Sequence, residues 1–203
     1  MLGLPPSTHI NRPLPKRAIF ERFKPRLEAR RLFDGQVGRL TIVAEISPQT
    51  VNLAPTEEVA AIYAIHVGLK TADCDKRNIA LLAQLIDQRM LFVMQYKEEA
   101  WMAVYKAGRV LLSEPAPMEH LTLSLGGLDL GAAWRNIVAT VGAIDLGEND
   151  DIDDAIARKE QLEKLARRID CLKKQARRET QPRRKWILVE EIKKLEIELK
   201  ILE

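Results

Sequence analysis

The sequence predicts an α+β protein, a mixed α/β fold in which helices pack on a mostly antiparallel sheet, followed by a C-terminal helical hairpin or coiled coil. Two observations lead to this prediction. Residues 39–125 contain short apolar runs with the alternation typical of strands, separated by a stretch with helical periodicity. After residue 150, leucine and isoleucine recur in two stripes at intervals of three and four, which is typical of helices packed along a narrow seam.

Length and composition suggest three segments. The 203 residues suit one core plus an appendage, and 46% hydrophobic with 30% charged residues excludes wholesale disorder. We predict a proline-rich N-terminal arm with short helices over residues 1–35, an α/β core domain over 36–146, and a basic coiled-coil hairpin over 151–203. No signal peptide or run of about 18 apolar residues is recognised, and the two cysteines lie far apart. We therefore expect a cytoplasmic protein with reduced thiols and no membrane contact.

The N-terminal segment is interrupted by prolines, each of which removes a backbone donor. We expect an extended arm with one short helix that starts near Pro15 and places Ile19 and Phe23 one turn apart. A second helix, over residues 27–33, should end near Gly35.

The core domain begins with two predicted strands. Residues 39–46 alternate apolar and polar positions, and Pro48 closes this strand. Residues 59–69 are apolar on both faces, which places the second strand inside the sheet. A helical pattern follows over residues 76–88, and its apolar face, which includes Ile86, should cover the sheet.

The second half of the core domain continues with a predicted antiparallel hairpin. Residues 90–96 and 100–105 are apolar runs that contain aromatic residues, and three charged residues separate them. Residues 121–125 alternate again. A further helix should start at Asp129, and the core domain should end near Ile144.

The two stripes after residue 150 predict a coiled-coil seam. Between them, Pro182 cannot donate the hydrogen bond that a continuous helix requires, and its ring disfavours helical geometry in Gln181. A hairpin would let the stripes bury each other within one chain. A kinked continuous helix is the alternative, and it would need a partner for both halves. The seam positions are Leu162, Leu165, Ile169, Leu172, Leu188, Ile192, Leu195, Leu199 and Leu202.

Positive charge gathers around Pro182, although the formal net charge of the chain is only +3. Phosphate contacts from these side chains would give sequence-independent affinity for nucleic acid, and Trp186 would stack on a base or anchor a partner. The alternative is a solvated outer face, or contact with an acidic protein surface, with Trp186 packed over the end of the hairpin. The candidate binding residues are Arg167, Arg168, Lys173, Lys174, Arg177, Arg178, Arg183, Arg184, Lys185 and Trp186.

Several short segments resemble a known family. They include Leu2-Gly3-Leu4-Pro5, Thr50-Val51-Asn52-Leu53, the run 90–96 leading to Ala100-Trp101, and Gly127-Leu128-Asp129-Leu130. With these motifs the chain resembles DUF4391, a bacterial family of domains of unknown function, over essentially its whole length. Members are typically encoded beside DNA methyltransferases and helicases in restriction-like or phage-defence loci. The resemblance implies that setting, and it implies no catalytic residues.

A restriction setting directs attention to a metal-dependent nuclease site, in which an acidic residue on one strand and a Glu-x-Lys on the next hold a divalent ion. The nearest fragment is Glu45 on the first predicted strand and Lys70 at the end of the second, with Asp73 just beyond. Gly68 stands where the second carboxylate is needed. A solvated strand end with a helix cap is therefore the favoured interpretation.

The remaining reactive side chains indicate no reaction. The three histidines share no spacing, and His66, inside the second predicted strand, favours a partly buried, hydrogen-bonded side chain over a metal ligand. Cys74 lies between two aspartates, which disfavour its thiolate and argue against a nucleophile. We expect no cofactor and no metal.

An accessory role fits these features better than an enzymatic one. The hypothesis is a non-enzymatic subunit of a bacterial restriction-like or phage-defence assembly, which docks a larger helicase or methyltransferase subunit and uses its basic tail to contact that partner or DNA. Self-association through the C-terminal helices is a further partner hypothesis. The alternative function is a divergent metal-dependent nuclease that uses Glu45, Lys70 and a nearby aspartate.

Overall fold

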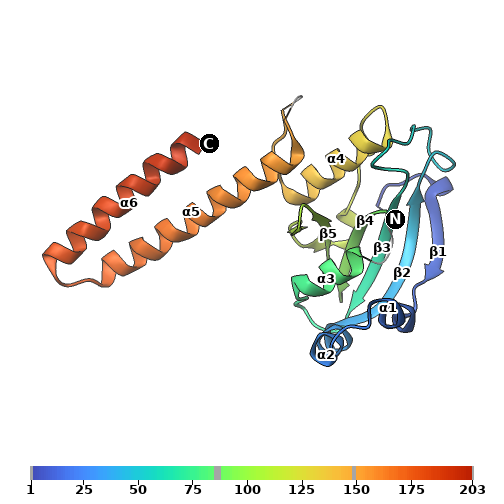
Figure 1. The fold of residues 1–203 in the computed structure, drawn as a ribbon, viewed down its shortest axis with the longest axis horizontal. Helices are drawn as coiled ribbons and strands as arrows, with labels where there is room; N and C mark the ends of the chain where they lie inside the picture. The colour runs from blue at the N-terminus through green and yellow to red at the C-terminus, as the bar shows by residue number, and fades with distance from the viewer. Residues whose placement is uncertain (1, 85–87, 148–149, 203) are drawn as a thin grey trace. The chain divides into compact units, whose positions relative to one another are not determined.

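The computed structural model describes residues 2–84, 88–147 and 150–202, and the chain divides into two compact units. The first unit, Met1–Ile144, holds the sheet, and the second, Asp145–Glu203, holds two long helices (Figure 1). The fold class is the predicted one, a mixed α/β arrangement with a mostly antiparallel sheet and a C-terminal helical region.

Within the described residues, seven strands form one sheet in the order β1-β2-β3-β4-β5-β6, with β7 paired to β5. Neighbouring strands are antiparallel except β3 and β4, which are parallel. The strands are β1 (His9–Pro13), β2 (Val37–Ile46), β3 (Ile62–Leu69), β4 (Arg89–Tyr96), β5 (Glu99–Lys106), β6 (Arg109–Leu112) and β7 (Ala116–Pro117).

The described helices comprise six α-helices and two short 3₁₀ helices. The 3₁₀ helices are η1 (Pro6–Thr8) and η2 (Met118–His120). The α-helices are α1 (Lys16–Phe23), α2 (Leu27–Gln36), α3 (Lys76–Ala83), α4 (Leu130–Gly142), α5 (Ile152–Arg178) and α6 (Pro182–Leu202).

Helix α3 supplies the crossover that the parallel pair β3 and β4 requires. Its residues Ile79 and Leu82 are buried in the core with residues of β2, β3 and β4, so the helix covers the sheet as predicted. The helix that the structure describes ends at Ala83, and the amide of Gln84 turns back to the carbonyls of Leu81 and Leu82. The predicted apolar position Ile86 lies outside the described residues.

Three other local predictions are confirmed. Helix α1 starts directly after Pro15, which occupies its N-cap position. Strands β4 and β5 form the predicted antiparallel hairpin, with Phe92 opposite Ala103. Helix α4 starts after Asp129, whose carboxylate accepts a hydrogen bond of 2.8 Å from the amide of Ala132 and so caps the helix.

Residues 1–35, expected to form an arm with short helices, contain those helices and in addition a strand. Strand β1 lies at the edge of the sheet, with Pro13 opposite Thr41, where a residue without an amide hydrogen is tolerated. Ile19 of α1 and Phe33 of α2 are fully buried in the core of the first unit. The prolines concealed this strand, because proline is rare inside sheets.

Strand β6 was not predicted from the sequence, in which the last strand of the predicted hairpin ended at Tyr105. It follows β5 through the two residues Ala107 and Gly108, whose φ angles are 51° and 75°. Positive φ at both central residues is the geometry of a two-residue hairpin turn that matches the twist of the strands. Glycine at the second position is the signal from which this hairpin was predictable.

Residues 121–125 alternate in burial but form no strand. Leu121 and Leu123 are buried, and the amide of Leu123 donates to the carbonyl of Leu2 at 3.0 Å. The alternation of apolar and polar residues indicates which side chains point into the core. A strand also requires a ladder of backbone hydrogen bonds with a neighbouring strand.

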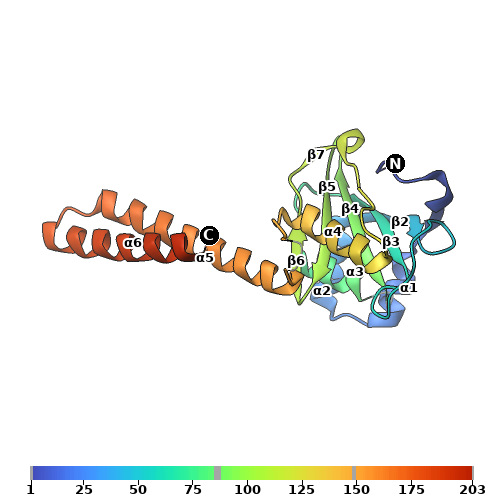
Figure 2. The same ribbon diagram turned by 90° about the horizontal axis from the view of Figure 1, so that it is seen from above.

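Helices α5 and α6 run side by side in opposite directions as a hairpin (Figures 1 and 2). The chain therefore adopts the first of the two geometries that Pro182 left open. Leu162, Leu165 and Leu202 are partly exposed. The buried residues at the centre of the hairpin are Ile169, Leu172, Ala176 and Ile192, with Leu188, Leu195 and Leu199 packed against them.

Two ion pairs between the helices flank this buried cluster. Arg168 and Glu191 meet at 3.0 Å, and Lys173 and Glu196 meet at 2.7 Å. With the seam residues at positions a and d of a heptad, the first pair joins two g positions and the second joins two e positions. Pairing of like positions follows from reversing one helix, because reversal places the same flanks of the two helices together.

The mutual burial of the two stripes predicts the effect of Leu172→Ala. Leu172 is only 3% exposed, and its truncation leaves a cavity, so the hairpin should lose about 2–5 kcal/mol of stability. Hydrogen exchange measured by mass spectrometry should then show faster exchange of the α6 amides. Leu27→Ala, at an exposed position of α2, is the control and should leave α6 exchange unchanged. Unaltered protection of α6 in Leu172→Ala would contradict the packing.

Candidate interaction site at the bend of the C-terminal helices

The chain reverses over three residues between α5 and α6. Helix α5 ends at the extended residue Glu179, whose carboxylate accepts a hydrogen bond of 2.9 Å from the amide of Gln181. Pro182 is the first residue of α6, where its missing amide hydrogen has no helical partner to lose. The sequence therefore stops one helix and starts the next at this place by local chemistry.

Four of the nine predicted basic residues are neutralised by carboxylates of the same hairpin. Two bridge the helices, as described above, and two pair along α5 at a spacing of four residues. The hydrogen bond from Lys174 lowers the pKa of Asp170. The pairs are Arg167 with Glu163, Arg168 with Glu191, Lys173 with Glu196, and Lys174 with Asp170, at 2.7–3.2 Å.

The other five basic residues flank the reversal, and all are exposed. In the part of the chain that the structure describes, none of the five forms an ion pair. The acid between them, Glu179, accepts a hydrogen bond from a backbone amide and offsets one of the five positive charges. Unneutralised positive charge is thus concentrated at the bend. We call these five residues the bend cluster: Arg177, Arg178, Arg183, Arg184 and Lys185.

Helix dipoles divide the bend cluster into two parts. Arg177 and Arg178 occupy the last turn of α5, where cations are favourable. Arg183, Arg184 and Lys185 occupy the first turn of α6, which contains no acidic residue, and there each cation costs about 0.3–1 kcal/mol at low ionic strength. Helix stability therefore explains the first two residues and does not explain the other three.

A cavity of about 500 Å³ opens at the bend. It combines two guanidinium groups and one carboxylate with apolar side chains, and the excess of positive charge suits a ligand with an anionic group and a flat or apolar body. Trp186 is 65% exposed and does not pack over the end of the hairpin. The lining residues are Gln175, Arg178, Glu179, Arg184, Ile187 and Leu188.

The structure does not assemble the nuclease fragment. Strands β2 and β3 are antiparallel, and Glu45 lies opposite Tyr63, where burial and then the Glu45 carboxylate raise the pKa of the tyrosine. Lys70 follows the other end of β3, seven residues away along the strand, which is roughly 23 Å at 3.3 Å per residue. Its Nζ donates to the backbone carbonyl of Asp34 at 2.6 Å. The interpretation of Glu45 and Lys70 as one site is therefore wrong.

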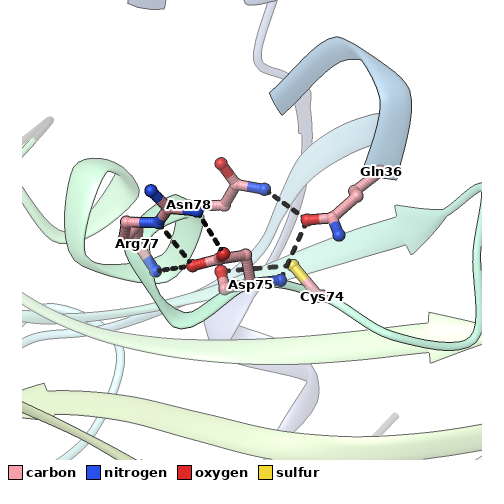
Figure 3. A network of polar contacts seen from close by, with 5 residues as sticks. All are labelled: Gln36, Cys74, Asp75, Arg77 and Asn78. Atoms are coloured by element: carbon pink, nitrogen blue, oxygen red, sulfur yellow. Dashed lines mark hydrogen bonds and ion pairs between the residues drawn. The ribbon is translucent and has the colours of Figure 1, made fainter. Parts of the chain in front are cut away.

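Asp73 and the neighbouring Asp75 also differ in role from a metal site. Asp73 is exposed, and Asp75 is the N-cap of α3. The guanidinium group of Arg77 donates two hydrogen bonds to the carboxylate of Asp75, at 3.0 and 2.7 Å (Figure 3). The backbone amide of Arg77 donates to the same carboxylate at 2.8 Å. Hydrogen bonds from the Arg77 side chain and then its amide lower the pKa of Asp75 from 3.8 to about 2.

A buried polar junction joins this helix cap to α2. Gln36 Oε1 accepts hydrogen bonds from the amide of Asp75, at 2.9 Å, and from the buried side chain of Asn78, at 2.8 Å (Figure 3). Burial raises the pKa of the Cys74 thiol to about 11, so the sulfur is protonated at neutral pH and is a poor nucleophile. The junction ties the start of α3 to the end of α2.

The remaining sequence candidates occupy structural positions. His66 is half-buried and shares a hydrogen bond of 2.6 Å with Gln95 Oε1, as expected. Among the described residues, no group of three or more histidine, cysteine, aspartate and glutamate side chains is positioned to hold a metal ion. Over the same residues, no helix has both the length and the apolar composition that crossing a membrane requires.

One feature of α6 escaped the sequence prediction. The seam residues cover one face of α6. The helix also has exposed large apolar residues outside the seam: Trp186, Ile187, Val189, Ile197 and Ile201. Their recurrence outside the seam spacing was the available signal, because a helix that packs on one side only carries polar residues elsewhere.

The family model of DUF4391, a domain of unknown function, matches residues 2–199. The chain belongs to this family. The resemblance found in its short motifs is thereby confirmed over nearly the whole length. No curated protein and no solved structure matches the chain. Family membership therefore carries no established activity, and the function must be argued from the geometry of the chain itself.

The depressed pKa of Asp75 predicts a pH-dependent contribution to stability. Asp75→Ala removes the helix cap and the ion pair, and should lower the free energy of unfolding by about 1 kcal/mol at pH 7. Because the folded pKa lies below the unfolded value of 3.8, the contribution of the carboxylate is complete above about pH 4 and is lost as the pH falls toward 2.

Urea denaturation from pH 7 to pH 2 measures this effect. Asp75→Asn keeps a good capping group and loses only the exposed ion pair, so it should be destabilised less than Asp75→Ala. The difference between wild type and Asp75→Asn should shrink as the pH falls from about 4 to 2. A constant difference over that range would show that the carboxylate charge makes no contribution.

Proposed function

We propose that this chain is a non-enzymatic accessory subunit of a bacterial restriction-like or phage-defence assembly, acting in the cytoplasm. In this proposal it docks a larger helicase or methyltransferase subunit and presents its bend cluster to nucleic acid. The observation that carries the proposal is the sorting of charge in the hairpin. Four cations are neutralised by carboxylates, whereas in the described residues the five of the bend cluster are not.

Nucleic acid suits the bend cluster for two reasons. Arginine and lysine contacts to phosphates release counterions and give affinity without sequence preference. Trp186 lies beside the cluster and is largely exposed, so that its ring is available to stack on an unpaired base. The cations in the first turn of α6 oppose the dipole of their own helix, and a bound phosphate would relieve that repulsion.

The assembly setting rests on the family. Members are typically encoded beside methyltransferases and helicases, which supports a role within a larger complex. Self-association through the seam is less well supported, because the two stripes already bury each other within one chain. The nuclease alternative has no geometric support, since Glu45 and Lys70 lie at opposite ends of the β2–β3 pair.

The proposal predicts a steep salt dependence of DNA binding. Full-length protein and labelled single-stranded DNA should bind with an affinity whose logarithm falls linearly with the logarithm of salt concentration, as fluorescence anisotropy would measure. Arg178→Gln combined with Arg184→Gln, two residues that line the bend cavity, should reduce the slope by about 1 to 2, because each lost phosphate contact removes roughly 0.7 to 0.9.

A matched control has the same change in net charge. Arg167→Gln combined with Lys174→Gln removes two cations that are paired along α5, and it should leave the slope nearly unchanged. Equal losses in both double variants would mean that total charge, rather than the bend cluster, determines binding. Absence of salt-dependent binding by the wild-type protein would overturn the nucleic-acid part of the proposal.

A cleavage assay separates the accessory role from the nuclease alternative. We expect the purified protein to leave plasmid and single-stranded DNA intact in magnesium or manganese, because the fragment of Glu45 and Lys70 is not assembled. Metal-dependent cutting that is abolished in Lys70→Ala would replace the accessory proposal with the enzymatic one.

A further inference from the structure

Helix α6 has apolar residues on two opposite sides. Its seam residues pack against α5, but three large apolar side chains lie well outside the seam: Trp186 is 65% exposed, Ile197 is 61% exposed and Ile201 is 78% exposed. We call these three residues the outer stripe. A surface helix that packs on one side only shows a single apolar stripe, so the outer stripe calls for a separate explanation.

The three residues of the outer stripe lie on one side of the helix, and Glu190 and Lys193 occupy that side between Trp186 and Ile197. At about 100° per residue, Ile197 lies about 20° around the helix from Trp186, and Ile201 lies about 60° from it. Fifteen residues separate the two ends, which is roughly 22 Å of helix at 1.5 Å per residue. The centre of the seam lies about 180° away on the same wheel. Three residues aligned over this length form a surface that fits one helix of similar length.

Positive charge borders the outer stripe. Within about 70° of its centre, by the same geometry, the helix carries Arg183, Lys193, Lys194 and Lys200 and the single acid Glu190. The carboxylate of Glu190 already binds Lys193 at 2.9 Å. On this wheel Glu190 lies near the midline and Arg183 lies in line with Ile201, whereas Lys193 and Lys200 lie on one border and Lys194 on the other. Four cations and one acid give this side of the helix an excess of positive charge.

We infer that the outer stripe is the docking site for a helix of a partner protein whose own apolar stripe is flanked by carboxylates. Such a helix buries the three apolar side chains and offers carboxylates to Lys194 and Lys200, which form no ion pair among the described residues. The hairpin and the partner helix then form a three-helix bundle. This inference rests on the proposed accessory role and specifies the chemistry of the partner.

A second copy of the chain fits the outer stripe less well. A twofold axis that brings Trp186 of one α6 opposite Ile201 of an antiparallel copy also brings Lys193 opposite Lys194. The single acid of this surface is already paired with Lys193, so a second copy brings no free carboxylate to Lys194 or Lys200. Charge complementarity therefore selects an acidic partner over self-association.

Two synthetic peptides test the inference on the full-length chain. Both are about four heptads long, with leucine and isoleucine at positions a and d. One has glutamate at positions e and g, and the other has lysine there. We expect the glutamate peptide to bind at least about tenfold more tightly than the lysine peptide in fluorescence anisotropy. Emission from the exposed Trp186 should shift to shorter wavelength as its ring is buried, whereas Trp134 is buried already and Trp101 is partly buried against the core of the first unit.

A double variant with a matched control locates the binding surface. Ile197→Ser combined with Ile201→Ser replaces exposed side chains, so circular dichroism should show an intact hairpin, while affinity for the glutamate peptide falls by at least about tenfold. Leu27→Ser combined with Leu128→Ser removes two exposed apolar residues of the first unit and should leave peptide affinity unchanged.

Other occupants of the outer stripe give distinct results. Equal binding of the two peptides, or binding of the glutamate peptide that the Ile197→Ser, Ile201→Ser variant retains, would overturn the inference. The inference would also be overturned if neither peptide bound and the chain formed a concentration-dependent dimer that the Ile197→Ser, Ile201→Ser variant does not form. It would likewise be overturned if neither peptide bound and the chain attached to phosphatidylglycerol vesicles only when Ile197 and Ile201 were present. DNA binding lost in the Arg178→Gln, Arg184→Gln variant tests the bend cluster separately, because those two residues lie outside the outer stripe.

Discussion

The second unit depends on one interaction, the burial of the α5 stripe against the α6 stripe. In proteins most of the stability of a helix comes from packing of its apolar side, and α6 starts with three cations that oppose its own dipole. Each leucine or isoleucine removed from water contributes about 1.5–3 kcal/mol. The seam around Leu172 and Ile192 therefore holds α6 in helical form, and every surface that α6 displays exists because that seam forms.

The reversal of the chain between α5 and α6 creates the candidate site. In the sequence, nine cations are spread from Arg167 to Lys185, but the hairpin brings the end of one helix and the start of the next to a single bend. Exposed ion pairs contribute little to stability, about 0–1 kcal/mol each. Their larger effect here is to neutralise the sides of the hairpin, as Arg168 and Glu191 do, so that positive charge remains concentrated at the bend.

The first unit shows a different use of polar residues. The side chains that resembled a catalytic fragment are employed in building the fold: Lys70 binds the carbonyl of Asp34, and Asp75 caps α3 and receives Arg77. Gln36 connects the end of α2 to that cap. A site of this kind stabilises a junction between elements.

Local chemistry was readable in the sequence. Strand alternation over residues 39–46, the capping aspartate at 129 and the break at Pro182 all express interactions within a few residues, and each was predicted correctly. Hydrophobic spacing likewise identified the seam, because it reports which side of a helix must be buried. Strand β1 was concealed by its prolines, since tolerance for proline depends on lying at the edge of a sheet.

Tertiary structure alone decided the rest. The antiparallel register of β2 and β3 separates Glu45 from Lys70, and no local pattern encodes that register. Residues from distant parts of the chain decide which cations pair with carboxylates. They also decide which apolar residues of α6 remain exposed. The sequence by itself determined which residues need burial or form helices and strands. The folded chain determined which apolar residues are buried and which charges are paired within the chain, because both require two elements to meet in space.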